Sequence, residues 1–164
     1  MGVLRDGNEW RSKASISATQ RSVDDAVKRC HENGWRLTPI RRRAVELMCL
    51  SEHPVRAYEL LHAIAGEQNV AQPMRIYRAL EFLTKKHFVR HLKSINAFVW
   101  CTSPEEASDA PFFICSECGV AAPISAPDVT ALLVKRAGEQ GLQADPGTME
   151  IHGLCGTCSG ESRR

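Results

Sequence analysis

Hydrophobic positions recur at helical spacing through the first half of the chain and then change to strand spacing. Residues 22–35, 37–53, 56–68 and 74–87 carry apolar side chains three and four positions apart, the period of amphipathic helices. The first helix is expected to begin at a capping Ser22, and the second to have Thr38 as its cap and Pro39 as its first residue. From residue 88 the period falls to two over FVRHLKSINAFVWC, which predicts a β-hairpin that turns near residues 94–96.

Short helices followed by a β-hairpin are typical of a winged helix-turn-helix domain, in which the helix before the hairpin is the recognition helix. In residues 74–87 the expected buried side consists of Ile76, Leu80 and Leu83. The side chains expected to point outward, where they can contact bases or phosphates, are Arg75, Tyr77 and Arg78. A helical protein–protein module with a solvated basic face is the alternative interpretation of this pattern.

The second half of the chain has a different pattern. Residues 102–111, TSPEEASDAP, are acidic and flanked by prolines, which is typical of a hinge. Strand candidates at PFFIC and VAAPI are followed by an amphipathic helix over residues 126–141 and one more extended segment. The stripe of that helix consists of Val129, Leu132, Leu133 and Ala137. This α/β unit has only about 50 residues and should need a staple, a partner subunit or both.

The fold class is therefore α+β, a winged-helix domain followed by a small α/β domain. The expected divisions are a flexible arm at 1–20, the winged-helix domain at 21–101, the hinge at 102–111, the α/β domain at 112–159 and a tail at 160–164. No apolar run approaches the roughly 20 residues of a membrane span, and no secretory signal is visible. We expect a soluble, cytoplasmic protein that keeps its thiols reduced.

Charge is divided unevenly along the chain, although the net charge is only +2. Residues 1–100 hold 17 basic and 10 acidic residues, whereas residues 101–164 hold 4 basic and 9 acidic ones. A basic first half joined to an acidic second half suggests a module that binds a polyanion. Ordinary solvated surface explains the charges alone equally well.

Four of the seven cysteines form two Cys-x-x-Cys pairs at the two ends of the α/β domain: Cys115 with Cys118, and Cys155 with Cys158. Two such turns can direct four thiolates at one point, which makes the closed tetrahedral site of structural zinc. We therefore expect one structural Zn²⁺ per chain. A thiol–disulfide oxidoreductase is the alternative, but its Cys-x-x-Cys opens a helix, whereas both pairs here follow strand candidates. Four cysteines also leave no open position for catalysis, so we do not expect an enzyme.

Taken together, the motifs RLTPIRRRAVELM, AYELL, IYRALEFL, FICSECG and HGLCGTC resemble the ferric uptake regulator superfamily, and within it the zinc uptake regulators most closely. The resemblance runs from about residue 21 to residue 159. It implies a homodimeric, metal-dependent transcriptional repressor of bacteria, with a winged-helix domain that binds DNA and a C-terminal dimerisation domain. It assigns structural zinc to the four cysteines above and DNA contacts to Tyr58, Tyr77 and Arg78, with Arg75 in place of a common threonine.

The resemblance also implies a second, regulatory metal near the hinge, and there the sequence departs from the family pattern. The cysteine at the end of the wing is present as Cys101. The first histidine position holds Arg90, with His91 beside it, and the second holds Ser108, with Asp109 beside it. The glutamate position holds Pro123. The candidate regulatory ligands are therefore Cys101, His91 and Asp109.

Two hypotheses about regulation follow. In the first, a zinc-responsive repressor of metal-uptake genes binds a palindromic operator when metal fixes the hinge, and Arg41, Arg42, Arg43, Lys85 and Lys86 contact phosphates. In the second, the fold is the same but the sensor is altered. Binding to double-stranded DNA would then be constitutive, or would respond to another metal or to peroxide.

Overall fold

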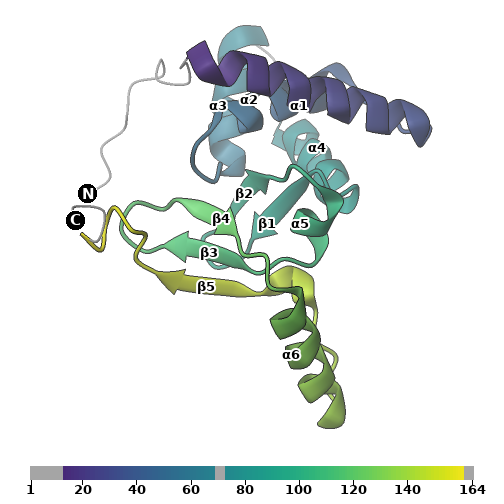
Figure 1. The fold of residues 1–164 in the computed structure, drawn as a ribbon. Helices are drawn as coiled ribbons and strands as arrows, with labels where there is room; N and C mark the ends of the chain where they lie inside the picture. Colours follow the sequence, from purple (N-terminus) through teal and green to yellow (C-terminus); the bar gives the residue numbers. More distant parts are fainter. Residues whose placement is uncertain (1–12, 69–72, 161–164) are drawn as a thin grey trace.

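The computed structural model describes residues 13–68 and 73–160, and Figure 1 shows their arrangement. The first part of the chain consists of α1 (Lys13–Glu32), α2 (Pro39–Leu50), α3 (Ala57–Gln68), α4 (Pro73–Lys85), β1 (Val89–Leu92) and β2 (Ala97–Trp100). The strands β1 and β2 pair antiparallel and form the predicted hairpin. Helices followed by this hairpin, the wing, confirm the predicted winged-helix layout.

The core of this part is built from the helix faces that the periodicity predicted. Ile76, Leu80 and Leu83 of α4 are at most 1% exposed, and they pack with buried side chains of α1, α2 and α3. Pro39 begins α2 as expected, but Thr38 makes no side-chain capping bond. Its carbonyl instead accepts a hydrogen bond from Arg42 N at 3.0 Å, which is an ordinary helical backbone bond.

The first helix begins at Lys13, and the prediction that it begins at Ser22 was wrong. Thr19 is only 8% exposed and lies one turn before Val23 on the same face of α1. The inward stripe therefore continues through a polar residue, which the hydrophobic pattern could not register. Residues 13–20 of the predicted arm are helical, and the rest of that arm lies outside the described residues.

The second part of the chain is a small mixed sheet with helices at its edge. Its elements are α5 (Pro104–Ser108), β3 (Phe112–Cys115), β4 (Ala121–Pro123), α6 (Pro127–Glu139), the 3-10 helix η1 (Pro146–Thr148) and β5 (Glu150–Gly153). The strand order is β4-β3-β5, in which β3 is antiparallel to β4 and parallel to β5. Because β3 and β5 are parallel, their carboxyl ends reach the same edge of the sheet (Figure 1).

The segment predicted as a hinge contains the short helix α5, which the sequence pattern did not reveal. Ser103 caps this helix by accepting a hydrogen bond from Glu106 N at 3.2 Å. Ala107 of α5 is buried in a second, smaller core with Leu92 of the wing and Phe112 of β3. This small core joins the wing to the sheet. The predicted division of the chain at residues 101 and 111 stays a prediction.

The apolar stripe of α6 belongs to neither of the two core clusters that the described residues form. Figure 1 shows α6 projecting away from the sheet, and Val129, Leu132 and Leu133 are 49%, 54% and 50% exposed. Ile151 on β5, the edge strand beside β3, is also 49% exposed. The periodicity predicted an amphipathic helix correctly, and the part of the chain that the structure describes leaves its apolar face about half exposed.

Candidate metal centre and nucleic-acid surface

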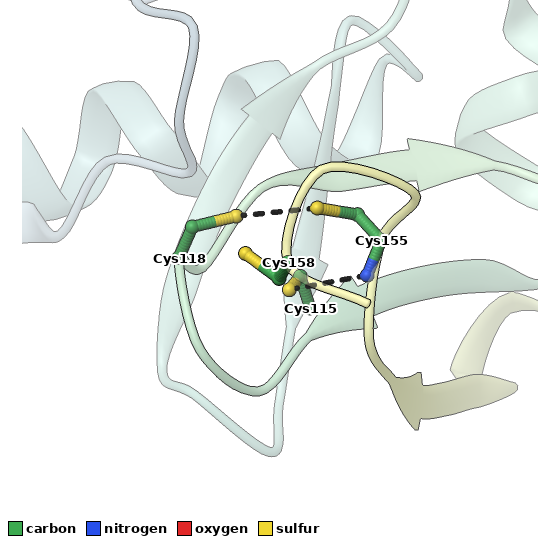
Figure 2. A group of neighbouring side chains, drawn as sticks. All are labelled: Cys115, Cys118, Cys155 and Cys158. Carbon is green, nitrogen blue, oxygen red and sulfur yellow. Dashed lines mark hydrogen bonds between the residues drawn. The ribbon is translucent and has the colours of Figure 1, made fainter. Parts of the chain in front are cut away.

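Two turns at the same edge of the sheet bring the four cysteines of the Cys-x-x-Cys pairs together. Cys115 is the last residue of β3 and lies in register with Gly153, the last residue of β5. The chain therefore leaves both strands at one place, and each turn carries two cysteines. In Figure 2 all four sulfurs point into the space between the two turns.

The geometry of this four-cysteine cluster fits a tetrahedral zinc ion. The four sulfur atoms all lie within 4.8 Å of one another, and those of Cys118 and Cys155 are 3.7 Å apart. Zn–S bonds of about 2.3 Å in a tetrahedron require sulfurs about 3.8 Å apart. All seven cysteines are free thiols, so the cluster is not a pair of disulfides. Other than this cluster, no group of three or more metal-ligating side chains is gathered within residues 13–68 and 73–160.

The two turns are closed by the same backbone hydrogen bond, although the left-handed residue falls at Gly119 in the first turn and one position later, at Gly160, in the second. Gly119 N donates to Cys115 O at 3.0 Å, and Ser159 N donates to Cys155 O at 2.8 Å, so both turns are closed by the same type of bond. Gly119 has φ +75°, which a residue with a side chain rarely adopts. Ser116 N also donates to Gly153 O at 2.8 Å and ties the first turn to the end of β5.

Backbone donors favour a negative charge at one sulfur of the cluster. The N–H groups of Cys118 and Cys155 lower the pKa of the Cys115 thiol to about 6, and Cys155 N lies 3.4 Å from that sulfur. Hydrogen bonds with Cys155 and Cys118 raise the pKa of Cys158 to about 12. A dication among the four sulfurs would reverse this second effect, because it stabilises thiolates directly. The arrangement therefore suits metal ligation.

The structure does not gather the candidate regulatory ligands into a ligand set. His91 stacks on Phe98 with ring centroids 4.5 Å apart and makes a 3.1 Å hydrogen bond with Asn96. Cys101 is 1% exposed, and burial and then Glu106 raise the pKa of its thiol to about 12. Asp109 is exposed beyond the end of α5. Side chains on successive strand residues point to opposite faces, which is why His91 and Arg90 diverge.

Arg90 occupies the buried junction near Cys101, and sequence reasoning did not assign it a structural role. Arg90 is 3% exposed, and Val89 and Leu92 of the same strand are buried as well. Burial lowers the pKa of Arg90, and the coulombic influence of Cys101 and of acidic side chains around it opposes that shift. Because a guanidinium stays charged in proteins, Arg90 places a buried positive charge at this junction. The sequence signal for this structural role was an arginine at a strand position whose side chain is expected to point inward.

The predicted DNA-contacting residues lie on the outer surface of α3 and α4. Tyr58 is 51% exposed and Tyr77 is 56% exposed, and both Arg75 and Arg78 are exposed. These side chains project from the helix faces opposite the buried stripes. The four of them therefore remain available to a ligand.

Several of the basic residues expected to contact phosphates have partners within the chain. Arg42 and Arg43 pair with Glu46 at 3.3 and 2.9 Å. The Arg41 guanidinium lies 3.5 Å from the centre of the Phe82 ring, and the Lys86 ammonium lies 4.2 Å from that of Trp35. Their charges remain at the surface, but phosphate contacts would compete with these interactions.

The family of the chain follows from comparison with known proteins. The model of the ferric uptake regulator family matches residues 32–152. The chain belongs to this family. It is 32% identical over 143 residues to the zinc uptake regulation protein of Escherichia coli K12, covering 87% of this chain and 84% of that protein.

Solved structures agree with this assignment. A zinc uptake regulator complexed with zinc and DNA has a TM-score of 0.80 and 31% identity, covering 89% of this chain and 98% of that chain. Holo XcZur has a TM-score of 0.75 and 41% identity, covering 84% of this chain and 96% of the other. Apo XcZur, covering 88% and 99% at 37% identity, has a TM-score of only 0.52. The arrangement described here is thus more similar to the holo form than to the apo form.

Among the helices of the described residues, none combines the length and the apolar character that crossing a membrane requires.

Proposed function

We propose that the chain is a zinc-responsive transcriptional regulator that binds a palindromic operator as a homodimer and represses metal-uptake genes. The observation that carries the proposal is the juxtaposition of a closed four-cysteine cluster and an exposed recognition helix α4 on one chain of this family. The similarity to a zinc uptake regulator complexed with zinc and DNA supports both halves of it. Such a repressor would act in the bacterial cytoplasm, where the chromosome lies.

In this proposal Cys115, Cys118, Cys155 and Cys158 hold one structural zinc ion. Four thiolates leave no coordination position open for water or substrate, so the ion fixes the two turns and catalyses nothing. The α/β unit is small, and the ion would compensate for its limited core. We accordingly propose a regulator without catalytic activity.

The proposed DNA contacts are made by Tyr58, Arg75, Tyr77 and Arg78. Arg75 and Arg78 lie three positions apart on α4 and are both exposed, so both can enter a major groove, where arginine forms bidentate bonds to guanine. A palindromic operator requires two such helices related by a twofold axis.

The partner that supplies the second recognition helix is a second copy of the chain. The stripe Val129, Leu132 and Leu133 is about half exposed, and it belongs to neither core cluster of residues 13–68 and 73–160. A self-complementary apolar surface is what a twofold interface requires, and burying it would also enlarge the core of a marginally small unit. These observations support α6 as part of the dimer interface.

A regulator with an altered sensor is the second candidate. Arg90 stands where the family resemblance places a histidine ligand, and His91 faces Phe98 instead. Regulatory ligation by Cys101, His91 and Asp109 stays a prediction, because it would require these side chains to move. Constitutive binding is the limiting case of this candidate.

Binding of the purified, zinc-loaded protein to DNA tests the proposal. An operator selected from a random-sequence library would be compared with a scrambled duplex of equal length at about 0.15 M salt, by fluorescence anisotropy. Specific binding should be at least about 10³-fold tighter than binding to the scrambled duplex. Equal affinities would refute sequence-specific regulation. Added zinc should tighten operator binding further, whereas an affinity that is flat across the titration selects the constitutive candidate.

A further inference from the structure

The Arg90 side chain joins the wing to three segments that follow it in the chain. Its Nη1 donates to Ala107 O of α5 at 3.2 Å, and its Nη2 donates to Pro146 O of η1 at 3.4 Å. The guanidinium also lies 5.4 Å from the centre of the Phe112 ring, at the start of β3. One buried cation on β1 thus contacts α5, η1 and β3, so separating the wing from the sheet would break all of these contacts together.

Glu150 makes the reciprocal contact from the sheet to the wing. This first residue of β5 accepts hydrogen bonds from Lys93 N at 2.7 Å and from Ser94 N at 3.1 Å, and also from the Ser94 hydroxyl. Lys93 and Ser94 form the turn between β1 and β2. His152, also on β5, contacts the same hydroxyl at 2.9 Å. The tip of the wing is therefore held by a carboxylate of the C-terminal unit, which is the second part of the chain from α5 to β5.

The two polar contacts enclose an apolar junction. Leu92 and Phe112, from the wing and from β3, are 0% and 1% exposed within the small core. Phe112 and Glu150 are register partners on β3 and β5, so the arginine contact and the carboxylate contact fall at the same end of the sheet. Wing and sheet consequently form one junction in the arrangement that is similar to holo XcZur.

We propose that Arg90 and Glu150 form an interdomain latch, which holds the wing against the C-terminal unit and favours the DNA-binding arrangement by the chain's own charges. The latch rests on the proposed DNA-binding function. It would stabilise the DNA-binding arrangement even without a regulatory metal. A regulatory ion would then shift an equilibrium that is already biased, because side-chain contacts present in only one arrangement stabilise that arrangement. Operator binding should therefore persist in protein that carries only the structural zinc.

The test uses the full chain carrying one zinc ion per chain, without added metal. Arg90→Ala should weaken operator binding roughly tenfold or more relative to the unmodified protein. Without DNA, the variant should have a larger radius of gyration by small-angle X-ray scattering. The amides of Lys93 and Ser94 should exchange hydrogen faster, because an open junction removes their acceptor, Glu150. Unchanged affinity, scattering and exchange would overturn the latch.

Arg29→Ala is a matched control. The Arg29 Nη2 donates to Lys86 O at 3.2 Å and His87 O at 3.5 Å, and its guanidinium lies 4.1 Å from the centre of the Phe88 ring. Its hydrogen bonds and ring contact are of the same kinds as those of Arg90, but they lie within the winged-helix unit, and it carries the same charge. Across the junction it has only a coulombic influence on Glu105 of α5, the smallest of the causes that lower the pKa of that carboxyl. Its loss should leave the scattering and the exchange of the wing turn unchanged. Equal effects of both substitutions on scattering and exchange would overturn the latch as an interdomain contact.

Glu150→Ala keeps the proposal falsifiable if Arg90→Ala does not fold. It should open the same junction and accelerate exchange at the wing turn, while the zinc content remains at one per chain. An unchanged radius of gyration in this variant would refute the latch. If the unmodified protein shows no preference for the selected operator, the proposed function fails, whereas scattering and exchange still decide the latch.

Discussion

Replacing Cys118 by alanine is the sharpest test of the structural zinc. The Cys118 side chain is exposed, so its loss removes little packing. Structural zinc contributes about 10–16 kcal/mol in zinc-finger peptides, or about 2.5–4 kcal/mol for each of four ligands. For a chain of 164 residues, 1 kcal/mol corresponds to about 2–4 °C in Tm. The expected fall in Tm is therefore roughly 5–16 °C.

The assay combines thermal unfolding with metal analysis and hydrogen exchange. Cys118→Ala should retain much less than one zinc per chain after dialysis against a chelator. Exchange should be faster at the Ser116 amide, which donates to Gly153 O at 2.8 Å and joins the first turn to the end of β5. Cys49→Ala serves as the control, because Cys49 is a half-buried thiol of the winged-helix unit outside the four-cysteine cluster. Its effect on Tm should be the same with and without chelator.

One result would refute the structural role of zinc. If Cys118→Ala and the chelator-treated protein both melt within about 2 °C of the untreated protein, the cluster contributes less than about 1 kcal/mol to stability. The Ser116 amide would then remain protected without metal. The α/β unit would have to be stabilised by its own core and by its partner subunit.

Three further outcomes are expected. Arg78→Ala should reduce the operator preference by about 1–3 kcal/mol, measured as the ratio of affinities for selected and scrambled DNA, and an unchanged ratio would exclude base readout by this residue. Leu132→Asp should shift the chain toward monomer in sedimentation velocity, since Leu132 is 54% exposed on the proposed dimer face, whereas a persisting dimer would place the interface elsewhere. Burial raises the pKa of Glu150, but hydrogen bonds from Ser94 and Lys93 outweigh it and leave that pKa below 4.5. The stability lost in Glu150→Gln should therefore be visible at neutral pH and fade as the pH falls below 4.5, and a difference that persists in acid would show that the carboxylate charge is not responsible.

The winged-helix layout was predictable because its helices bury one face within their own chain. Ile76, Leu80 and Leu83 are spaced so that only a helix brings them to one side, and the core confirms it. The four cysteines were predictable for a similar reason. Two turns with the same Cys-x-x-Cys spacing indicate one shared site, and parallel pairing of β3 with β5 brings the turns together.

Features that depend on neighbours distant in sequence were not predictable in the same way. Periodicity identified the apolar face of α6 but contained no information about what covers it. The start of α1 was missed because Thr19 is a polar member of a buried stripe. The inward strand position of Arg90 was visible in the sequence, but its partners were not. They are the backbone carbonyls of Ala107 and Pro146, and every residue has such a carbonyl.

The zinc cluster and the latch are connected through the same pair of strands. Cys115 ends β3 beside Gly153, while Phe112 begins it beside Glu150, so the β3–β5 register fixes both ends at once. Four strand residues separate the two ends by only about 10 Å. A zinc ion bound by the two cysteine turns would hold the carboxyl ends of both strands together. It would thereby also hold Phe112 and Glu150 in position beneath the wing. Loss of the structural ion should therefore accelerate exchange at the Lys93 and Ser94 amides, although neither residue belongs to the cluster. If the ion is lost and exchange becomes faster at the cysteine turns but not at the Lys93 and Ser94 amides, the two ends of the sheet act independently.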